Sequence, residues 1–287
     1  MFAVLITITF GFAFNSVQSN TLCAAFEGAF GFDHAVVGGI ITALTLTIIF
    51  GGVQRIAKVS SIIVPIMALG YIALALIIVL LNIKELPGVL ALIVGHAFGW
   101  EQALGGGVGM ALMQGIKRGL FSNEAGMGST PHAHARAKAE SPHHQGLCAM
   151  VSVFIDTFIV LNLTVFSVLT TGVMSSGKDG TALTQAAFMK GFGSAGIIFV
   201  AVCLFFFAFS TILSWHFFGL VNVKYLFGEK ASKLYSLIVV VCIVIGSSLK
   251  LELVWSLADF FNGLMVIPNV LALLALSGLV VRASKER

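Results

Sequence analysis

The 287-residue chain is 58% hydrophobic and only 10% charged, with a mean hydropathy of +1.04. This composition excludes an ordinary soluble domain and indicates an all-α polytopic membrane protein. The net charge of +4 is small, and the basic residues lie between apolar runs, so they are typical of topology signals and do not indicate a nucleic-acid partner.

The cysteines each lie alone in or beside an apolar segment. None has CxxC spacing or a nearby histidine suited to a metal site, so we interpret them as packing residues. The chain also has no HExxH motif and no convincingly placed serine and histidine for nucleophilic attack, so we expect neither an enzyme nor a cofactor. The cysteines are Cys23, Cys148, Cys203 and Cys242.

The first predicted span covers residues 2 to about 30 and carries an unusual density of amides and hydroxyls inside apolar surroundings. Groups of this kind face protein or a cavity and not lipid. Hydrogen bonding between helices explains most of them equally well. They are Asn15, Ser16, Gln18, Ser19, Asn20 and Thr21.

Two further spans are predicted at residues 36–53 and 61–81, the second with Pro65 near its start. The apolar run at 87–100 is Gly-spaced and shorter than the ~20 residues that cross a bilayer. We therefore predict an interfacial or re-entrant helix there.

A fourth span, at residues 105–134, is broken within 114–134, where charges and glycines occur together in QGIKRGLFSNEAGMGSTPHAH. In a bilayer core an unsatisfied backbone group costs several kcal/mol, so irregular backbone occurs there only where it is buried in protein or lines a wet cavity. The free ends of a broken helix hold anionic groups and cations in transporters. We predict a binding site at this break; a polar loop dipping to the interface is the alternative.

The segment PHAHARAKAESPHHQG follows and contains several histidines. Nothing fixes their side chains on one rigid face, and the segment is also rich in basic residues, so we interpret it as a solvated cytosolic loop and not as a metal site. The histidines are His132, His134, His143 and His144.

The fifth predicted span, residues 146–171, contains Asp156 among apolar residues. An isolated charge at this depth costs at least ~2.5 kcal/mol even on the mildest insertion scale, so the acid needs a cationic partner or a proton. Lys117 and Arg118 lie one connection away in the broken span. We predict that Asp156 pairs with one of them.

Residues 175–193 are polar and then amphipathic, which indicates an external lid or an interfacial helix. Three more spans bring the predicted total to eight, at residues 195–220, 234–249 and 258–281.

The sixth span contains the sequence AFSTILSW. In it Ser210 precedes Ser214 by four residues, and Thr211 precedes Trp215 by four. Two adjacent ridges of one helix therefore present hydroxyls and an indole.

The distribution of basic residues predicts that both termini lie in the cytosol. With alternating sides, the inner segments collect ten lysines and arginines and the outer segments four, when Lys117 and Arg118 are counted as intramembrane. The inner residues are Arg55, Lys58, Arg136, Lys138, Lys224, Lys230, Lys233, Arg282, Lys285 and Arg287, and the outer residues are Lys84, Lys178, Lys190 and Lys250.

Several segments together carry a family pattern: GLFSNEAGMGS at 119–129, the QG at Gln145 and Gly146, VFIDT at 153–157, FNSVQSN at 14–20 and WSLADFFNGLMVIPN at 255–269. They resemble the signature of the sodium:alanine symporters, also called the alanine or glycine:cation symporter family. The resemblance extends over essentially the whole chain. It implies a plasma-membrane transporter related to the inverted-repeat fold of amino-acid and sodium symporters.

The resemblance also implies a function and a site. The function is sodium-driven symport of a small neutral amino acid such as alanine or glycine across the lipid bilayer. The implied substrate site consists of Gln18, Ser122, Asn123, Thr211 and Trp215, and Ser210 and Thr211 are suited to sodium as hard oxygen ligands. From the residues alone, hydrogen bonds from these hydroxyls to the carbonyl one turn back are the alternative.

Family members have a longer N-terminal part with a Gly- and Thr-rich broken helix, and nothing in this chain matches it. The chain is therefore expected to form a single transmembrane domain over residues 1–287 that resembles core helices three to ten of a five-plus-five inverted repeat. Half of the expected substrate and sodium ligands would then be missing. A non-transporting membrane subunit, or a remnant of a split or truncated transporter, is the alternative hypothesis.

Overall fold

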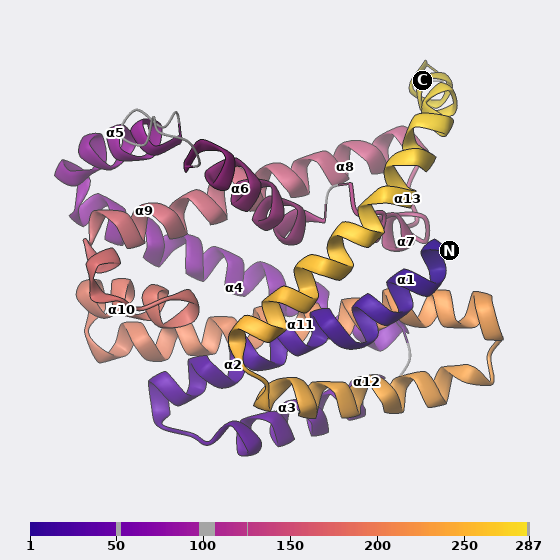
Figure 1. The fold of residues 1–287 in the computed structure, drawn as a ribbon, viewed down its shortest axis with the longest axis horizontal. Helices are drawn as coiled ribbons and strands as arrows, with labels where there is room; N and C mark the ends of the chain where they lie inside the picture. Colours follow the sequence, from indigo (N-terminus) through magenta and orange to yellow (C-terminus); the bar gives the residue numbers. More distant parts are fainter. Residues whose placement is uncertain (50–52, 98–106, 125, 286–287) are drawn as a thin grey trace.

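The structure is a computed structural model that describes residues 1–49, 53–97, 107–124 and 126–285. These ranges are helical and contain no strand, as the composition predicts (Figure 1). The longer helices are α1 (Phe2–Ile8), α2 (Phe14–Phe30), α3 (His34–Ile49), α4 (Val53–Leu81), α5 (Leu86–Ala97), α6 (Gly107–Asn123), α8 (Pro142–Phe154), α9 (Asn162–Thr170), α10 (Gly180–Phe192), α11 (Ser194–Phe227), α12 (Ala231–Ser248) and α13 (Leu251–Lys285). The short elements are η1 (Thr9–Ala13), η2 (Ile83–Glu85), α7 (Pro131–His134), η3 (Ile155–Leu161) and η4 (Val173–Ser176).

Six helical segments of the described chain are long and apolar enough to cross a membrane. They match six of the eight predicted spans. The other two predictions, 36–53 and 105–134, overlap residues outside the described ranges; the first contains most of the shorter apolar helix α3. The six segments are Phe2–Phe30, Ser61–Leu81, Pro142–Thr170, Ser194–Phe227, Ala231–Ser248 and Leu251–Ala283.

The first span is one continuous helix with a π turn, η1, between α1 and α2. The wider turn coincides with a side-chain hydrogen bond, since Asn15 Nδ2 donates to the carbonyl of Phe10, 2.5 Å away in the buried interior. A π turn inserts one extra residue and turns the following side chains to a new direction. The polar residues of FNSVQSN begin directly after it.

The centre of the fold is α11, which packs along α1, α2, α4, α10 and α12. In Figure 1, α13 crosses diagonally over the first span, and α8 lies on the other side of α13 from α12. One buried cluster joins the first span, α11 and α13 through Phe10, Phe14, Trp215, Phe218 and Met265.

Close approach of α11 and α12 depends on Gly219. A Cβ at this position would lie 1.7 Å from Tyr235 Oη and 2.6 Å from its Cζ. Gly11 in η1 borders the same ring, with a Cβ position 3.0 Å from Tyr235 Cε2. The absence of side chains at both glycines thus makes room for the buried tyrosine.

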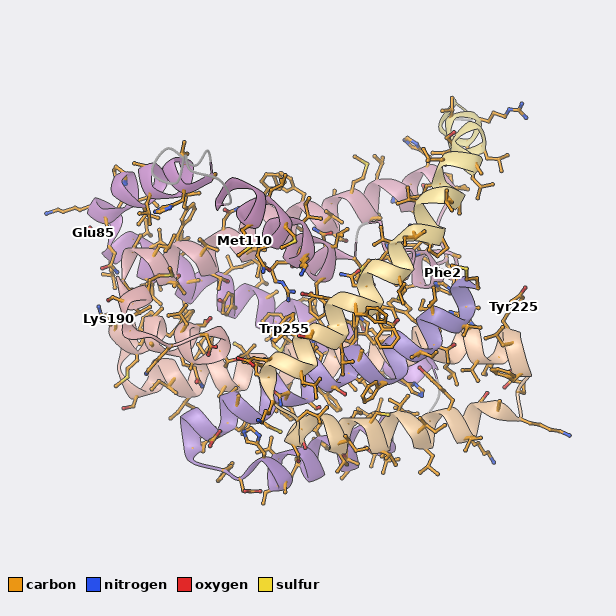
Figure 2. The ribbon with its side chains drawn as sticks, in the orientation of Figure 1. Phe2, Glu85, Met110, Lys190, Tyr225 and Trp255 are labelled. Carbon is orange, nitrogen blue, oxygen red and sulfur yellow. The ribbon has the colours of Figure 1, made fainter. Side chains whose placement is uncertain are left out.

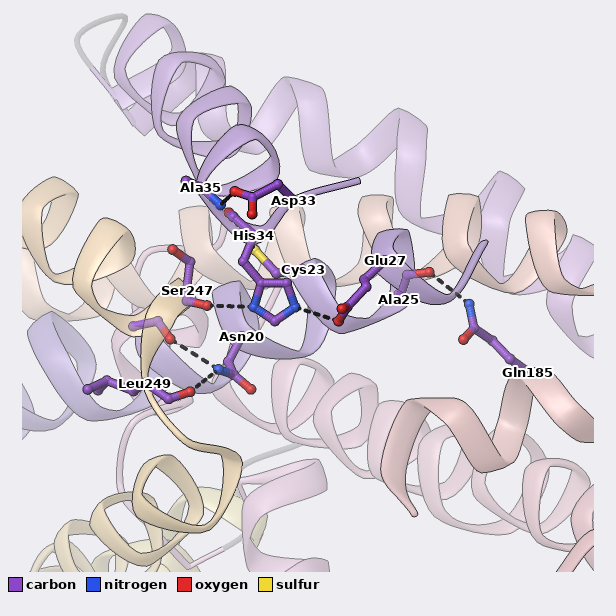
Figure 3. A network of polar contacts seen from close by, with 11 residues as sticks. Asn20, Cys23, Ala25, Glu27, Asp33, His34, Ala35, Gln185, Ser247 and Leu249 are labelled. Carbon is purple, nitrogen blue, oxygen red and sulfur yellow. Dashed lines mark hydrogen bonds and ion pairs between the residues drawn. The ribbon is translucent and has the colours of Figure 1, made fainter. Parts of the chain in front are cut away.

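Polar contacts close the end of the fold where α2, α3 and α12 meet (Figure 3). His34 Nδ1 lies 3.0 Å from the carbonyl of Ser247, and its Nε2 lies 3.0 Å from Glu27 Oε2. Asn20 Nδ2 donates to the carbonyl of Leu249 at 2.7 Å, which satisfies an end group of α12.

Residues 175–193 are the segment predicted as an external lid or interfacial helix. They contain the last two residues of η4 and all of α10, and α10 packs against α2 and α11. Gln185 is buried and donates to the carbonyl of Ala25 at 2.9 Å (Figure 3). Lys190 Nζ donates to the carbonyl of Thr171 at 2.6 Å. These contacts attach α10 to the bundle.

Candidate functional site

The break in residues 114–134 lies between α6 and α7. Helix α6 ends at Asn123, and Glu124 adopts the left-handed conformation with φ 55°. Gly126 and Gly128 follow with φ values of 86° and 84°. Asn269 of α13 donates to the Gly126 carbonyl at 2.8 Å, so a side-chain amide satisfies part of the irregular backbone.

Glu124 is held by donors from two elements. Its Oε1 accepts a hydrogen bond from the indole Nε1 of Trp215 in α11. Its Oε2 accepts from Ser129 Oγ at 2.5 Å and faces Thr130 Oγ1 at 3.4 Å. The carboxylate thereby connects the end of the broken helix to the AFSTILSW face.

Four aromatic rings meet beside this carboxylate. Phe121 lies with its ring centroid 4.9 Å from that of Phe14, 5.0 Å from Trp255 and 5.8 Å from Trp215. Phe14 and Trp215 are 5.0 Å apart. We call Phe14, Phe121, Trp215 and Trp255 the aromatic layer; it joins the first span, α6, α11 and α13.

The first cavity lies against the broken helix, with a volume of about 1160 Å³. Ser122, Asn123 and Glu124 line it, together with Asp156 from η3 and Asn269 from α13. Ser122 Oγ donates to Asp156 Oδ2 at 2.7 Å, and Asn123 Nδ2 donates to Thr157 Oγ1 at 3.0 Å. The exposed residues Glu140 and Pro142 also line this cavity, so it opens to the surface beside the predicted cytosolic loop.

The prediction that Asp156 pairs with Lys117 or Arg118 is wrong. Both cations face Asp259 of α13: Arg118 forms an ion pair with Asp259 Oδ1, and Lys117 Nζ lies 3.5 Å from Oδ2. Closeness along the chain is a poor guide here, because the direction in which α6 presents each residue decides its partner. Asp156 instead accepts the hydrogen bond from Ser122.

Arg118 also contacts the aromatic layer, since its guanidinium carbon lies 4.4 Å from the centroid of the Trp255 ring. A cation over an indole face is attracted by the ring quadrupole. Figure 2 shows Trp255 toward the middle of the molecule, where α13 crosses it. The turn of α6 that carries Phe121 is thus attached to α13 by charge and by ring contacts.

A second cavity has a volume of about 450 Å³, and its lining shares no residue with that of the first. Its lining includes Thr21 of α2, Phe207 of α11 and Trp255 of α13. Tyr71 and Thr164 also line it and share a 2.7 Å hydrogen bond. The exposed Asp179, before α10, belongs to the same lining, so this cavity also opens to the surface.

The predicted sodium ligands lie on α11 with their hydroxyls directed to their own helix. Ser210 Oγ and Thr211 Oγ1 donate to the Phe207 carbonyl at 2.9 and 2.8 Å. This is the local arrangement that the sequence left open as the alternative. Each oxygen keeps a lone pair for a further contact.

Gln18 and Thr211 lie on two helices that pack against each other, α2 and α11. On α2, Gln18 follows Phe14 by four residues and precedes Thr21 by three; on α11, Thr211 lies four residues from both Phe207 and Trp215. Residues at these spacings share one helix face. Both side chains therefore belong to faces that run from the aromatic layer to the second cavity, whereas Ser122 and Asn123 line the first cavity.

The sequence reasoning missed the roles of Glu124 and Asp259. Both are acids inside segments with apolar neighbours, which was the available signal. Their partners come from helices that are distant in sequence: Trp215 lies 91 residues from Glu124, and Asp259 lies 141 from Arg118.

In the described residues, an all-helical bundle with six candidate membrane spans indicates a multi-pass membrane protein, and a helix broken beside a cavity is an arrangement that transporters use. The chain belongs to the sodium:alanine symporter family, whose model matches residues 1–286. The resemblance predicted from the signature segments is confirmed.

Named relatives are similar over nearly the whole chain. It is 47% identical to the probable sodium/glutamine symporter GlnT of Bacillus subtilis, which it matches over 100% of its own length and 60% of the relative. It is 42% identical to the amino-acid carrier protein AlsT of the same organism, over 100% of the chain and 62% of the relative. It is 38% identical to the sodium/alanine symporter AgcS of Methanococcus maripaludis, over 94% and 60%. The chain thus spans about three fifths of the length of these relatives.

Proposed function

We propose that this chain carries out, or forms part of a protein that carries out, sodium-coupled symport of a small neutral amino acid, alanine or glycine. Membership of the sodium:alanine symporter family supports this proposal, as do the names of relatives described as sodium symporters. The structural observation that carries it is the contact of the broken helix with α11, where Glu124 binds Trp215 at the wall of an open cavity.

The proposed substrate groups are Gln18, Ser122, Asn123, Thr211 and Trp215. A zwitterion needs donors for its carboxylate and acceptors for its ammonium, which amides, hydroxyls and the ends of a broken helix supply. Trp215 is only 4% exposed and lies among aromatic rings, so it is suited to an apolar wall that limits substrate size. In a conformation that allows transport, the groups on the two sides of the aromatic layer would approach one substrate.

Ser210 and Thr211 are the proposed sodium ligands. They can bind the ion while they donate to the Phe207 carbonyl, because the donated proton leaves a lone pair on each oxygen. Sodium is the coupling ion that the family description and the relatives' names support.

The experiment is uptake of radiolabelled alanine into liposomes that contain the protein, with a sodium gradient or with potassium in its place. We expect uptake only with the sodium gradient, and competition by unlabelled glycine. Stronger competition by glutamine, the substrate in the name of one relative, would contradict the proposed substrate class. Equal uptake in both salts would contradict sodium coupling.

Trp215 variants test the proposed size limit. Trp215→Ala removes the wall and should admit larger neutral amino acids as competitors, whereas Trp215→Phe keeps an apolar wall and loses only the indole donor to Glu124. An unchanged competitor profile in Trp215→Ala would remove Trp215 from the substrate site.

The proposed orientation has both termini in the cytosol of a cell whose plasma membrane holds the protein. Ser176 in η4 is exposed, so a Ser176→Cys variant tests this orientation. An impermeant thiol reagent should reach it from outside the cell, and labelling only from inside would contradict the proposal.

A further inference from the structure

We propose that Phe121 is the barrier residue between the two cavities, and that Arg118, through Asp259 and Trp255, positions it. This inference rests on the proposed transport function and assigns a role to a residue outside the predicted substrate site. Its starting point is that the Phe121 ring of α6 contacts Trp255, a wall residue of the second cavity, and directly precedes Ser122, a wall residue of the first.

The contact path between the cavities is short. Trp255 lines the second cavity, and the centroid of its ring lies 5.0 Å from that of Phe121. Ser122, the next residue, lines the first cavity. One ring of α6 therefore links a wall residue of the second cavity to a wall residue of the first.

The surroundings of Phe121 are aromatic on several sides. Phe14 of the first span and Trp215 of α11 pack against the ring, with centroid distances of 4.9 and 5.8 Å. Closely packed apolar rings exclude water and hydrated ions, which a transporter requires between its two openings. Polar groups lie directly beside the layer, with Ser122 following Phe121 and Glu124 bound to Trp215.

Arg118 is suited to hold this ring in place. It precedes Phe121 by three residues, so both lie on neighbouring positions of the same helix face. Its guanidinium forms the ion pair with Asp259 and lies over Trp255, which attaches this turn of α6 to α13. Release of these contacts would free α6 to move relative to α13 and separate Phe121 from Trp255.

Labelling of single cysteines measures the barrier. Ser122→Cys reports on the first cavity and Thr21→Cys on the second, in a background that carries Cys148→Ser, because Cys148 is exposed, and Cys203→Ser, because Cys203 lines the second cavity. The remaining cysteines, Cys23 and Cys242, are buried. An impermeant thiol reagent is added to one side of sealed vesicles, and the rate of labelling is measured. With Phe121 present, the reagent should label each cysteine mainly from the side of its own cavity.

In Phe121→Ala we expect the rate from the opposite side to rise by about tenfold or more, because the closed layer loses its central ring. Phe154→Ala is the matched control, because Phe154 lines the first cavity but its described ring contact is with Phe158 and not with the aromatic layer. This control should leave both rates unchanged. Phe121→Leu, which keeps an apolar side chain, is measured as well in case the alanine variant does not fold, and should give an intermediate increase.

Arg118→Gln tests the positioning role separately. It should raise labelling from the opposite side while the Phe121 ring is still present, whereas Lys224→Gln at an exposed ion pair should not. Unchanged one-sided labelling in folded Phe121→Ala and Phe121→Leu would overturn the barrier proposal, even with intact sodium-dependent uptake. Since labelling needs no transport, absence of uptake with the expected labelling would contradict only the proposed function.

Discussion

Glu124 accepts a hydrogen bond from the indole of Trp215, and this contact joins the end of the broken helix α6 to the middle of α11. Two hydroxyls on Ser129 and Thr130 face the other carboxylate oxygen. The carboxylate therefore faces three donors, one from α11 and two from adjacent residues just before α7. Its backbone has a positive φ of 55°, which an L-residue adopts only when its surroundings hold it there.

Glu124→Gln should impair transport while it leaves the shape of the side chain nearly unchanged. The amide nitrogen cannot accept, so at least one buried donor loses its partner, at a cost of about 1–3 kcal/mol. We expect a lower thermal unfolding temperature and a lower maximal uptake rate. Glu140→Gln is the control, because Glu140 lines the same cavity but is exposed; equal effects of the two substitutions would contradict a specific role for Glu124.

Thr211→Val should raise the sodium concentration needed for half-maximal alanine uptake by about tenfold, equivalent to about 1.4 kcal/mol of binding. The substitution keeps the volume and removes one oxygen. Ser214→Ala is a matched control on the same helix, since Ser214 makes the same type of hydrogen bond, to the Ser210 carbonyl at 3.0 Å. A purely local role for these hydroxyls predicts similar, small effects of both variants on the sodium dependence.

Asp259→Asn should destabilise the protein more than Asp156→Asn. Asp259 faces two cations, whereas Asp156 accepts one described hydrogen bond from a hydroxyl. We expect a loss of about 1–3 kcal/mol, below the 3–5 kcal/mol of a fully buried pair, because the Arg118 side chain is 39% exposed.

The charge-swapped variant Arg118→Asp with Asp259→Arg should recover part of that stability, measured as the thermal unfolding temperature in detergent. Glu229→Gln, at the exposed pair with Lys224, should change it little. A larger loss in Asp156→Asn than in Asp259→Asn would reverse the assignment of the charge pair.

Gly219→Ala should lower stability by about 1–3 kcal/mol, since the new methyl group would overlap the Tyr235 ring and force α11 and α12 apart. Gly263→Ala is the control within α13, because a Cβ there has no neighbour within 4 Å. Thermal unfolding followed by size-exclusion chromatography measures both. Equal unfolding temperatures for the two variants would show that the helices adjust to the extra methyl group freely.

Hydropathy and the signature segments predicted the all-helical, multi-pass class and the family, and both are confirmed. They did not predict which side chains of different helices face each other, and the one such pairing proposed, between Asp156 and Lys117 or Arg118, is wrong. Lys117 and Arg118 lie in the span that precedes Asp156, one connection away, yet they face Asp259, because a rotation of α6 about its axis changes every partner without changing its hydropathy.

For the candidate site, too, the sequence indicates residues but not the contacts between helices. The family pattern predicts Gln18, Thr211 and Trp215 as site residues, and that assignment stays a prediction. In the helices of the structure, Gln18 lies four residues from Phe14 and Thr211 four from Phe207. The link from Trp215 to Glu124 depends on a left-handed residue after α6, and a pattern of hydrophobic and polar residues does not specify that turn. The aromatic layer likewise combines rings from four helices whose order in space the sequence does not contain.

As the proposed barrier, the aromatic layer would also determine where a membrane voltage acts on this protein. Water in two open cavities carries the potential of each side inward, so the voltage falls mainly across the rings between them. Moving one elementary charge through 100 mV involves about 2.3 kcal/mol. In the proposed symport, a sodium ion that passes Phe121 would do most of that electrical work within the thickness of one ring, and the voltage dependence of uptake would then be a property of this single turn of α6.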